Sequence, residues 1–111
     1  MSLAFADHVD GVAADHVVVE LGPVAYKAQL LTTLARALNP QLDSSAVVDN
    51  LDAFYDHLTE ASGAIAAVSA AAWWRAEPLL MSQVSQCFID VGGGVALTWV
   101  MTSATETTET S

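Results

Sequence analysis

Hydrophobic and polar residues follow two periodicities along this chain, and each predicts a different kind of element. Short apolar or β-branched runs that end near glycine, proline or polar residues predict strands over residues 16–21, 64–68 and 95–101. The valine-rich run at residues 16–21 predicts a buried strand. Apolar positions spaced three and four residues apart predict helices over residues 26–38, 49–59 and 78–91. Pro78 in a first turn and the glycines after Val91 are typical of the start and end of the last helix.

The order of these elements predicts an α/β fold. Strands that alternate with helices pair in parallel through right-handed crossovers. We therefore expect a small three-stranded parallel sheet packed by three to four helices, in one domain over residues 16–101. Residues 1–15, which are compatible with a short helix or strand, form a lead-in segment to this domain. The Thr-, Ser- and Glu-rich residues 102–111 are expected to be a disordered tail.

The predicted helix over residues 49–59 separates into two stripes. The inward stripe has the spacing i, i+3, i+7 and consists of Leu51, Phe54 and Leu58. The outward stripe has the spacing i, i+3, i+4, i+7 and consists of Asp52, Tyr55, Asp56 and Thr59. Two carboxylates one helical turn apart weaken a helix slightly. The outward stripe is therefore either a solvated surface or a binding surface kept for a partner.

The charge balance favours a basic protein partner. The chain has 111 residues with 13 acidic and three basic side chains, and its net charge is −10. Such a surface repels nucleic acid and anionic membranes, whereas opposite charge speeds association with a basic protein. Residues 43–60 lack Lys and Arg and hold five of the acids, namely Asp43, Asp49, Asp52, Asp56 and Glu60.

Motifs for catalysis, metals and cofactors are absent from the sequence. There is no Gly-x-Ser-x-Gly, no His-Glu-x-x-His and no cysteine pair, so we predict neither a catalytic residue nor a cofactor. Ala-Asp-His-Val occurs at residues 6–9 and 14–17, but two His-Asp pairs without a scaffold do not predict a metal site. The single Cys87 lies in an apolar helical pattern and is expected to be a small buried side chain.

The location of the protein is predicted from three features. One cysteine excludes an intramolecular disulfide framework and is compatible with a reducing compartment. The first residues lack a basic segment typical of signal peptides, and no apolar run is long enough to span a bilayer. We expect a cytoplasmic protein without membrane contact, which is a monomer when free.

Residues 50–59, Asn-Leu-Asp-Ala-Phe-Tyr-Asp-His-Leu-Thr, resemble the signature helix of the barstar family of intracellular ribonuclease inhibitors. The family pattern at this point is Asn-Leu/Trp-Asp-Ala-Leu-aromatic-Asp-x-Leu-Thr. The resemblance extends over roughly residues 12–101 in the order of the predicted elements, although only this ten-residue block is specific. It implies the barstar fold and a function as an inhibitor, immunity protein or antitoxin.

The resemblance also implies roles for individual residues. In the barstar family this helix and the loop before it plug the nuclease active site, where carboxylates take the places of RNA phosphates. Asp56 would then be the central phosphate mimic, Asp52 a second one, Tyr55 an aromatic contact and Thr59 the end of the interface. Asp90, near the end of the last helix, would match a further acidic contact.

The loop before the helix departs from the family pattern. That loop usually carries a proline, aromatic residues and a glycine, but residues 39–49 contain no aromatic residue and no glycine. We include Asp49, its last residue, in the predicted partner-binding surface. The identity of the target, a basic ribonuclease or another toxin with a basic active site, stays open.

Two further hypotheses belong to other functional classes. Trp73 and Trp74 predict a packed pair with one ring inside and one at the surface, and an interaction domain of barstar-like fold would use this aromatic surface instead. A small enzyme would use Asp52 and Asp56 as paired carboxylates. That chemistry requires a concave, apolar pocket beside them to raise one pKa.

Overall fold

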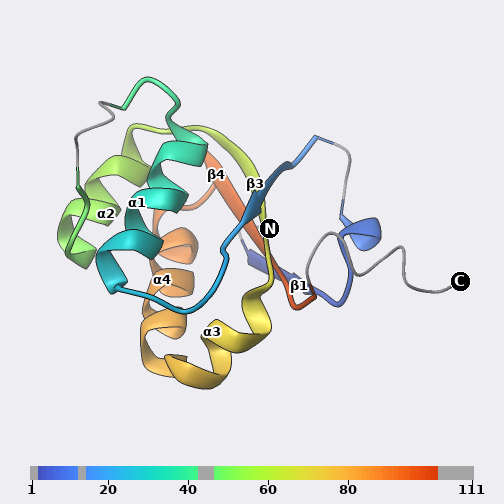
Figure 1. Cartoon of the computed structure of the whole chain (residues 1–111). Coiled ribbons are helices and arrows are strands. Elements are labelled where there is room, and N and C mark those ends of the chain that lie inside the picture. Colours follow the sequence, from blue (N-terminus) through green and yellow to red (C-terminus); the bar gives the residue numbers. More distant parts are fainter. Residues whose placement is uncertain (1–2, 13–14, 43–46, 103–111) are drawn as a thin grey trace, which may run out of the picture.

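The computed structural model describes residues 3–12, 15–42 and 47–102, and these form a sheet covered by helices (Figure 1). The elements in chain order are β1 (Leu3–Ala6), η1 (a 3-10 helix, Val9–Gly11), β2 (Val17–Glu20), α1 (Lys27–Leu38), α2 (Leu51–Thr59), β3 (Gly63–Val68), α3 (Ala70–Ala76), α4 (Pro78–Val91) and β4 (Val95–Val100). The predicted α/β class is therefore confirmed. The predicted tail lies outside the described residues, apart from Thr102.

The sheet has four strands in the order β1-β4-β3-β2, and all neighbouring strands are parallel. The prediction of three strands was wrong because Leu3–Ala6, within the predicted lead-in segment, pairs with β4. Leu3 faces Leu97 and Ala6 faces Val100 in this register. The segment before the predicted domain thus supplies one edge of its sheet.

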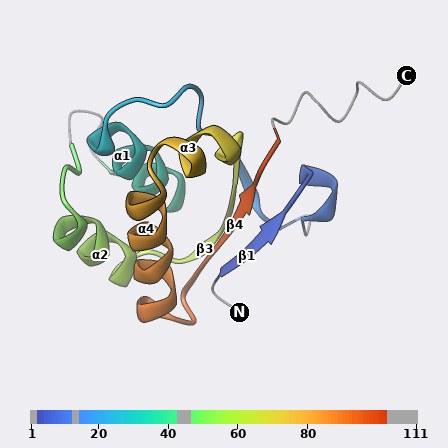
Figure 2. The ribbon, with the colours of Figure 1, turned by 90° about the horizontal axis from the view of Figure 1, so that it is seen from below.

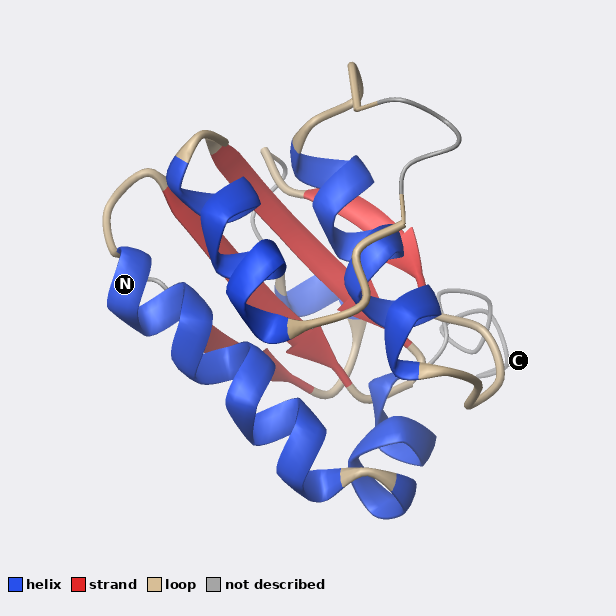
Figure 3. Cartoon of the chain, turned by 90° about the vertical axis from the view of Figure 1, so that its left-hand side faces the viewer, coloured by secondary structure: helices blue, strands red, loops and turns tan. Residues whose placement is uncertain are grey.

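The connections between strands explain which faces of the sheet are covered. From β2 to β3 to β4 the chain moves in one direction across the sheet, so crossovers of the same hand place their helices on one face. Figure 2 shows the helices α1, α2, α3 and α4 on that face, which Figure 3 shows from the front. From β1 to β2 the chain moves in the opposite direction, so the same hand requires this connection to cross the other face. Figure 2 shows η1 on that other side.

The main core lies between the helices and the sheet. Its largest fully buried side chains are Trp73, Trp99, Phe54, Phe88, Leu30, Leu31, Leu34 and Leu58. The rings of Phe54 on α2 and Phe88 on α4 lie 6.0 Å apart, which joins the two helices. Buried Trp99 donates its indole N–H to the Ser85 hydroxyl at 2.8 Å, so that its polar atom is satisfied.

A second, smaller core lies on the opposite face. Val9 and Val12 of the β1–β2 connection pack against Ala66, Val68 and Val100, which are fully buried. The hydroxyl of Thr102 also donates to the carbonyl of Asp7 at 2.7 Å. The connection is thus held against the carboxyl-terminal ends of β3 and β4.

β2 differs from its prediction as a buried strand. It forms an edge of the sheet, and Val17 and Val18 are 53% and 49% exposed. A run of valines is typical of a central strand. Whether that strand is buried depends on which elements lie beside it, and this is a property of the fold. The sequence pattern also missed α3 as a separate helix, since alanines dominate its first turn.

Candidate functional site

The candidate site is built on α2, whose first turn is fixed by a side-chain cap. Asn50 has an extended backbone, and its side-chain oxygen accepts a hydrogen bond from the Ala53 N–H at 2.8 Å. Asparagine is among the best residues for this role because its oxygen satisfies an otherwise free amide of the first turn. Asp52 in the same turn complements the positive end of the helix dipole. The helix thus begins at Leu51, two residues after the predicted start at residue 49.

The segment before α2 is fixed to α1 by one buried side chain. The Thr32 hydroxyl accepts a hydrogen bond from the Val48 N–H at 2.9 Å, and both residues are buried. Because residues 43–46 are not described, this bond is the nearest described anchor before the helix. It sets where the chain enters Asn50 and therefore how α2 lies on the core.

The two predicted stripes of α2 face opposite environments. Phe54 and Leu58 are fully buried, and Leu51 is half-buried against the core. Asp52, Asp56 and Thr59 are exposed, as predicted. Tyr55 is half-buried, so its ring lies partly against the protein instead of pointing fully outward. The Thr59 hydroxyl donates a hydrogen bond to the Asp56 carbonyl at 2.7 Å, so its hydrogen is used within the last turn of the helix.

Asp90 lies on the neighbouring helix and belongs to the same surface. Burial raises the pKa of the Cys87 thiol, and the carboxylates of Asp90 and Asp52 raise that pKa further. The two carboxylates come from helices that pack against each other, Asp90 from α4 and Asp52 from α2. Asp90 is exposed and accepts a hydrogen bond from the Gln86 amide at 2.9 Å. Cys87 itself is half-buried against the core, which is consistent with the predicted packing role.

The carboxylates of Asp52 and Asp56 have no partner within the described part of the chain. Neither takes part in an ion pair or a side-chain hydrogen bond there. Neither α2 nor α4 contains Lys or Arg. Asp49 is exposed and accepts a hydrogen bond from the Asn50 amide at 3.2 Å. Asp43, the first of the five acids in residues 43–60, lies outside the described residues.

The two adjacent tryptophans do not form one exposed surface. Trp73 is 1% exposed and donates its indole N–H to the Gly22 carbonyl at 3.2 Å, so it is not available to a partner. Trp74 is half-buried, and its ring lies 5.7 Å from Phe5 and 6.0 Å from Trp99. The prediction of one ring inside and one at the surface is therefore confirmed in outline. Phe5, 55% exposed, is an aromatic contact that the sequence pattern did not indicate.

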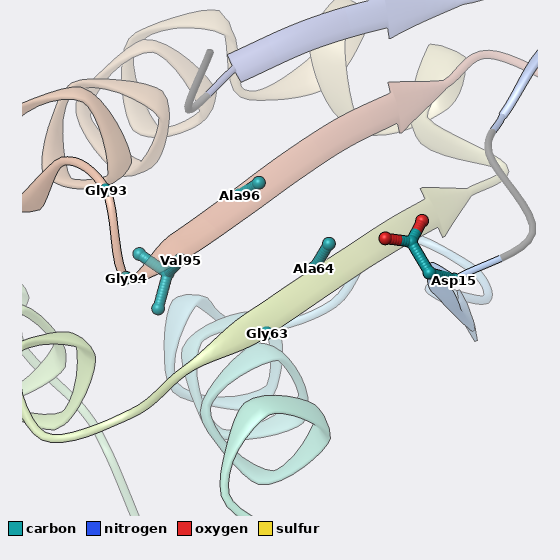
Figure 4. Close-up of a pocket in the computed structure, with 7 residues that line it drawn as sticks. All are labelled: Asp15, Gly63, Ala64, Gly93, Gly94, Val95 and Ala96. Carbon is teal, nitrogen blue, oxygen red and sulfur yellow. The ribbon is translucent and has the colours of Figure 1, made fainter.

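Two hollows in the described structure lie away from the acidic stripe. One of about 300 Å³ lies over β3 and β4 and is lined by Asp15, Gly63, Ala64, Gly93, Gly94, Val95 and Ala96 (Figure 4). Another, of about 250 Å³, is lined by residues of α1 and by Val47. Neither of these two hollows is lined by Asp52 or Asp56.

The two His-Asp pairs of the Ala-Asp-His-Val repeats make separate contacts. His16 Nδ1 lies 3.1 Å from the Asp15 carboxylate, whereas His8 lies 3.3 Å from the Thr102 hydroxyl at the other end of the connection. Across residues 3–12, 15–42 and 47–102 no group of three or more His, Cys, Asp or Glu is placed to hold a metal ion.

Comparisons with known proteins do not identify the chain. No protein-family model matches it, and neither the curated proteins nor the solved structures contain a significant match. In the described residues no helix is long and apolar enough to cross a membrane.

Proposed function

We propose that this protein is a barstar-like inhibitor that blocks the active site of a basic ribonuclease or related toxin. The observation that carries the proposal is the pair of exposed carboxylates, Asp52 and Asp56, one turn apart and without a partner in the described structure. The resemblance of residues 50–59 to the barstar helix supports the use of the same surface for binding. As an immunity protein or antitoxin, the chain would act in the cytoplasm, as one molecule per target and without a cofactor.

The chemistry of the surface suits a target that binds phosphates. An enzyme that cleaves RNA presents Arg, Lys and His side chains to the phosphate backbone. Carboxylates at fixed positions form charge-assisted hydrogen bonds with guanidinium groups, and these strengthen once water is excluded. Asp56 would meet the centre of the basic site and Asp52 its flank. Asp90 on α4 would extend the contact beyond α2, with Tyr55, Thr59 and Asp49 around it.

The fold supports this use of α2 because the helix is anchored at three points. Phe54 and Leu58 bury its inner stripe, the Asn50 side chain caps its first turn, and the Thr32–Val48 hydrogen bond holds the preceding segment. A surface that is already rigid loses little conformational freedom on binding. Its carboxylates can therefore bind a partner, because the fold does not depend on them.

A capture experiment tests the proposal. The wild-type chain and the Asp52→Ala/Asp56→Ala variant are used as bait in an extract of the source cell at low and high salt. The matched control is Asp7→Ala/Asp10→Ala, which removes the same charge from another part of the surface. We expect a small basic nuclease or toxin to bind wild type and the control, and to be lost with the α2 variant. In a direct titration, Asp56→Ala should weaken the complex most and Asp52→Ala next.

The proposal fails if the α2 variant retains the same partner, or if the control loses it equally. In the first case the acidic stripe is only a solvated surface. In the second, net charge and not position determines the association. Inhibition of the captured enzyme's cleavage of a fluorogenic RNA, at one inhibitor per enzyme, would separate an inhibitor from a simple binder.

A second candidate function is an interaction domain that uses an aromatic surface. Phe5 on β1, with its ring against Trp74 on α3, is the observation that favours it. Such an association would be apolar and therefore insensitive to salt. It would be lost in Phe5→Ala and unchanged in Asp52→Ala/Asp56→Ala, which is the opposite result in the same capture experiment.

A further inference from the structure

We propose that the hollow over the amino-terminal ends of β3 and β4 is a binding site for a basic side chain, arginine or lysine, presented by a partner polypeptide. This site lies on the face of the sheet to which the methyl groups of Ala64 and Ala96 point (Figure 4), and the α-helices cover the opposite face (Figure 2). It is therefore separate from the acidic stripe of α2 and does not rest on the proposed inhibitor function.

The hollow exists because the residues of its floor have small side chains or none. Ala64 on β3 and Ala96 on β4 are directly paired in the sheet, and Gly63 precedes them on β3. Their neighbours Ile65 and Leu97 point to the helical face and are buried there. At this end of the sheet each strand thus places a large residue on the helical face and an alanine on the other. Larger side chains at these positions would fill the space of about 300 Å³.

The connection from β1 to β2 covers only part of this face. Val9 and Val12 pack on the carboxyl-terminal ends of the strands, against Val68 and Val100. The hollow lies at the other end, where the turn with Gly93 and Gly94 forms one wall. An added Cβ at Gly93 would meet nothing within 4 Å, so this wall is open.

One ionisable side chain lines the hollow, and it is a carboxylate. Figure 4 shows the Asp15 side chain on the same side of the sheet as the methyl groups of Ala64 and Ala96. One oxygen, Oδ1, lies 3.1 Å from His16 Nδ1, while Oδ2 has no hydrogen bond to any residue that the structure describes. No lysine or arginine lines the hollow.

This combination matches the two parts of a basic side chain. The aliphatic stem of an arginine or lysine packs well on small apolar groups, and its charged head seeks a carboxylate at the rim. The overall charge of −10 also favours a cation over an anion at this face. Because Asp15 is exposed to solvent, the affinity for a single side chain should be weak, with a dissociation constant on the order of millimolar.

The test is a titration followed by nuclear magnetic resonance of the backbone amides. The probe is N-acetylarginine methylamide, and its neutral isostere is N-acetylcitrulline methylamide. We expect the arginine probe to shift the amides of Gly93, Gly94 and Ala64 in a saturable way, and the citrulline probe to bind at least fivefold more weakly. Asp15→Asn should weaken binding of the arginine probe by about fivefold or more.

Two control variants separate position from charge. Asp10→Asn removes the same charge from the same connection without touching the hollow, and should change the affinity less than twofold. Ala96→Leu fills the floor and should abolish the shifts at Gly93 and Gly94, with circular dichroism confirming that the variant is folded.

The proposal is overturned if Asp10→Asn and Asp15→Asn weaken binding equally, because the attraction is then only that of net charge. It is also overturned if the citrulline probe binds as well as the arginine probe. A parallel titration with 1,4-diaminobutane separates the source of the cation. Saturable, Asp15-dependent binding of this diamine, without binding of the arginine probe, would assign the site to a free polyamine and reject a polypeptide partner.

Discussion

Asp52 on α2 and Asp90 on α4 both act on the thiol of Cys87. The pKa of this thiol is raised first by burial, then by Asp90 and then by Asp52. Two residues that are far apart in the sequence thus contribute to one negative surface. The Phe54–Phe88 ring contact, which joins the same two helices, keeps them together from beneath.

This relationship predicts how the thiol responds to loss of each carboxylate. Removal of a nearby negative charge stabilises the thiolate, so Asp90→Asn should lower the pKa of Cys87, and Asp52→Asn should lower it by less. At a fixed pH below that pKa, the rate of alkylation by iodoacetamide should rise in the order wild type, Asp52→Asn, Asp90→Asn. The rate as a function of pH gives each pKa directly. Asp10→Asn, a remote control, should match wild type, and identical profiles for all four proteins would contradict the shared surface.

The exposed carboxylates of α2 should contribute little to the stability of the free protein, because the favourable interaction of Asp52 with the helix dipole opposes its repulsion from Asp56. Asp52 and Asp56 make no described ion pair, and like charges at i,i+4 are unfavourable by a few tenths of a kcal/mol. Asp52→Ala and Asp56→Ala should therefore each leave the free energy of unfolding within about 0.5 kcal/mol of wild type. Urea unfolding followed by circular dichroism measures this. A loss of several degrees in melting temperature would show that the stripe serves the fold, not a partner.

The hydroxyl of Thr32 should be needed for both stability and binding. Thr32→Val preserves the shape of the side chain but leaves the buried Val48 N–H without its acceptor, which should cost about 1–3 kcal/mol of unfolding free energy. Since this bond also positions the segment before α2, affinity for the captured target should fall as well. The neighbouring Thr33→Val, on a half-buried side chain, is the control. Unchanged unfolding of Thr32→Val would mean that water replaces the hydroxyl.

Local signals in the sequence predicted the helices whose ends carry a characteristic residue. α4 begins at Pro78 and ends before Gly92, and α2 begins after Asn50, because these residues restrict the backbone or satisfy its free amides. The outward direction of Asp52 and Asp56 followed from helical spacing alone. Such features depend on neighbours within four or five residues, which the sequence displays directly.

Features that depend on distant neighbours could not be predicted in the same way. β1 pairs Leu3 with Leu97, and nothing local to residues 3–6 marks that partner. The exposure of Val17 follows from the place of β2 at an edge, which is a property of strand order. The hollow beside Asp15 is made mostly by glycine and alanine residues from two strands and the loops beside them, so no motif could indicate it.

The hydrogen bond between Trp99 and Ser85 provides a test of how the core is held together. Ser85 accepts the indole N–H at 2.8 Å and donates to the Met81 carbonyl at 2.8 Å, within the buried contact of β4 and α4. Ser85→Ala leaves the indole N–H buried without an acceptor, which should cost about 1–3 kcal/mol. Its control is Ser82→Ala on the exposed side of the same helix, which should change stability by less than about 0.5 kcal/mol. Urea unfolding monitored by tryptophan fluorescence measures both variants. Equal stability of Ser85→Ala and Ser82→Ala would mean that the packing of the Trp99 ring, and not its hydrogen bond, fixes β4 against α4.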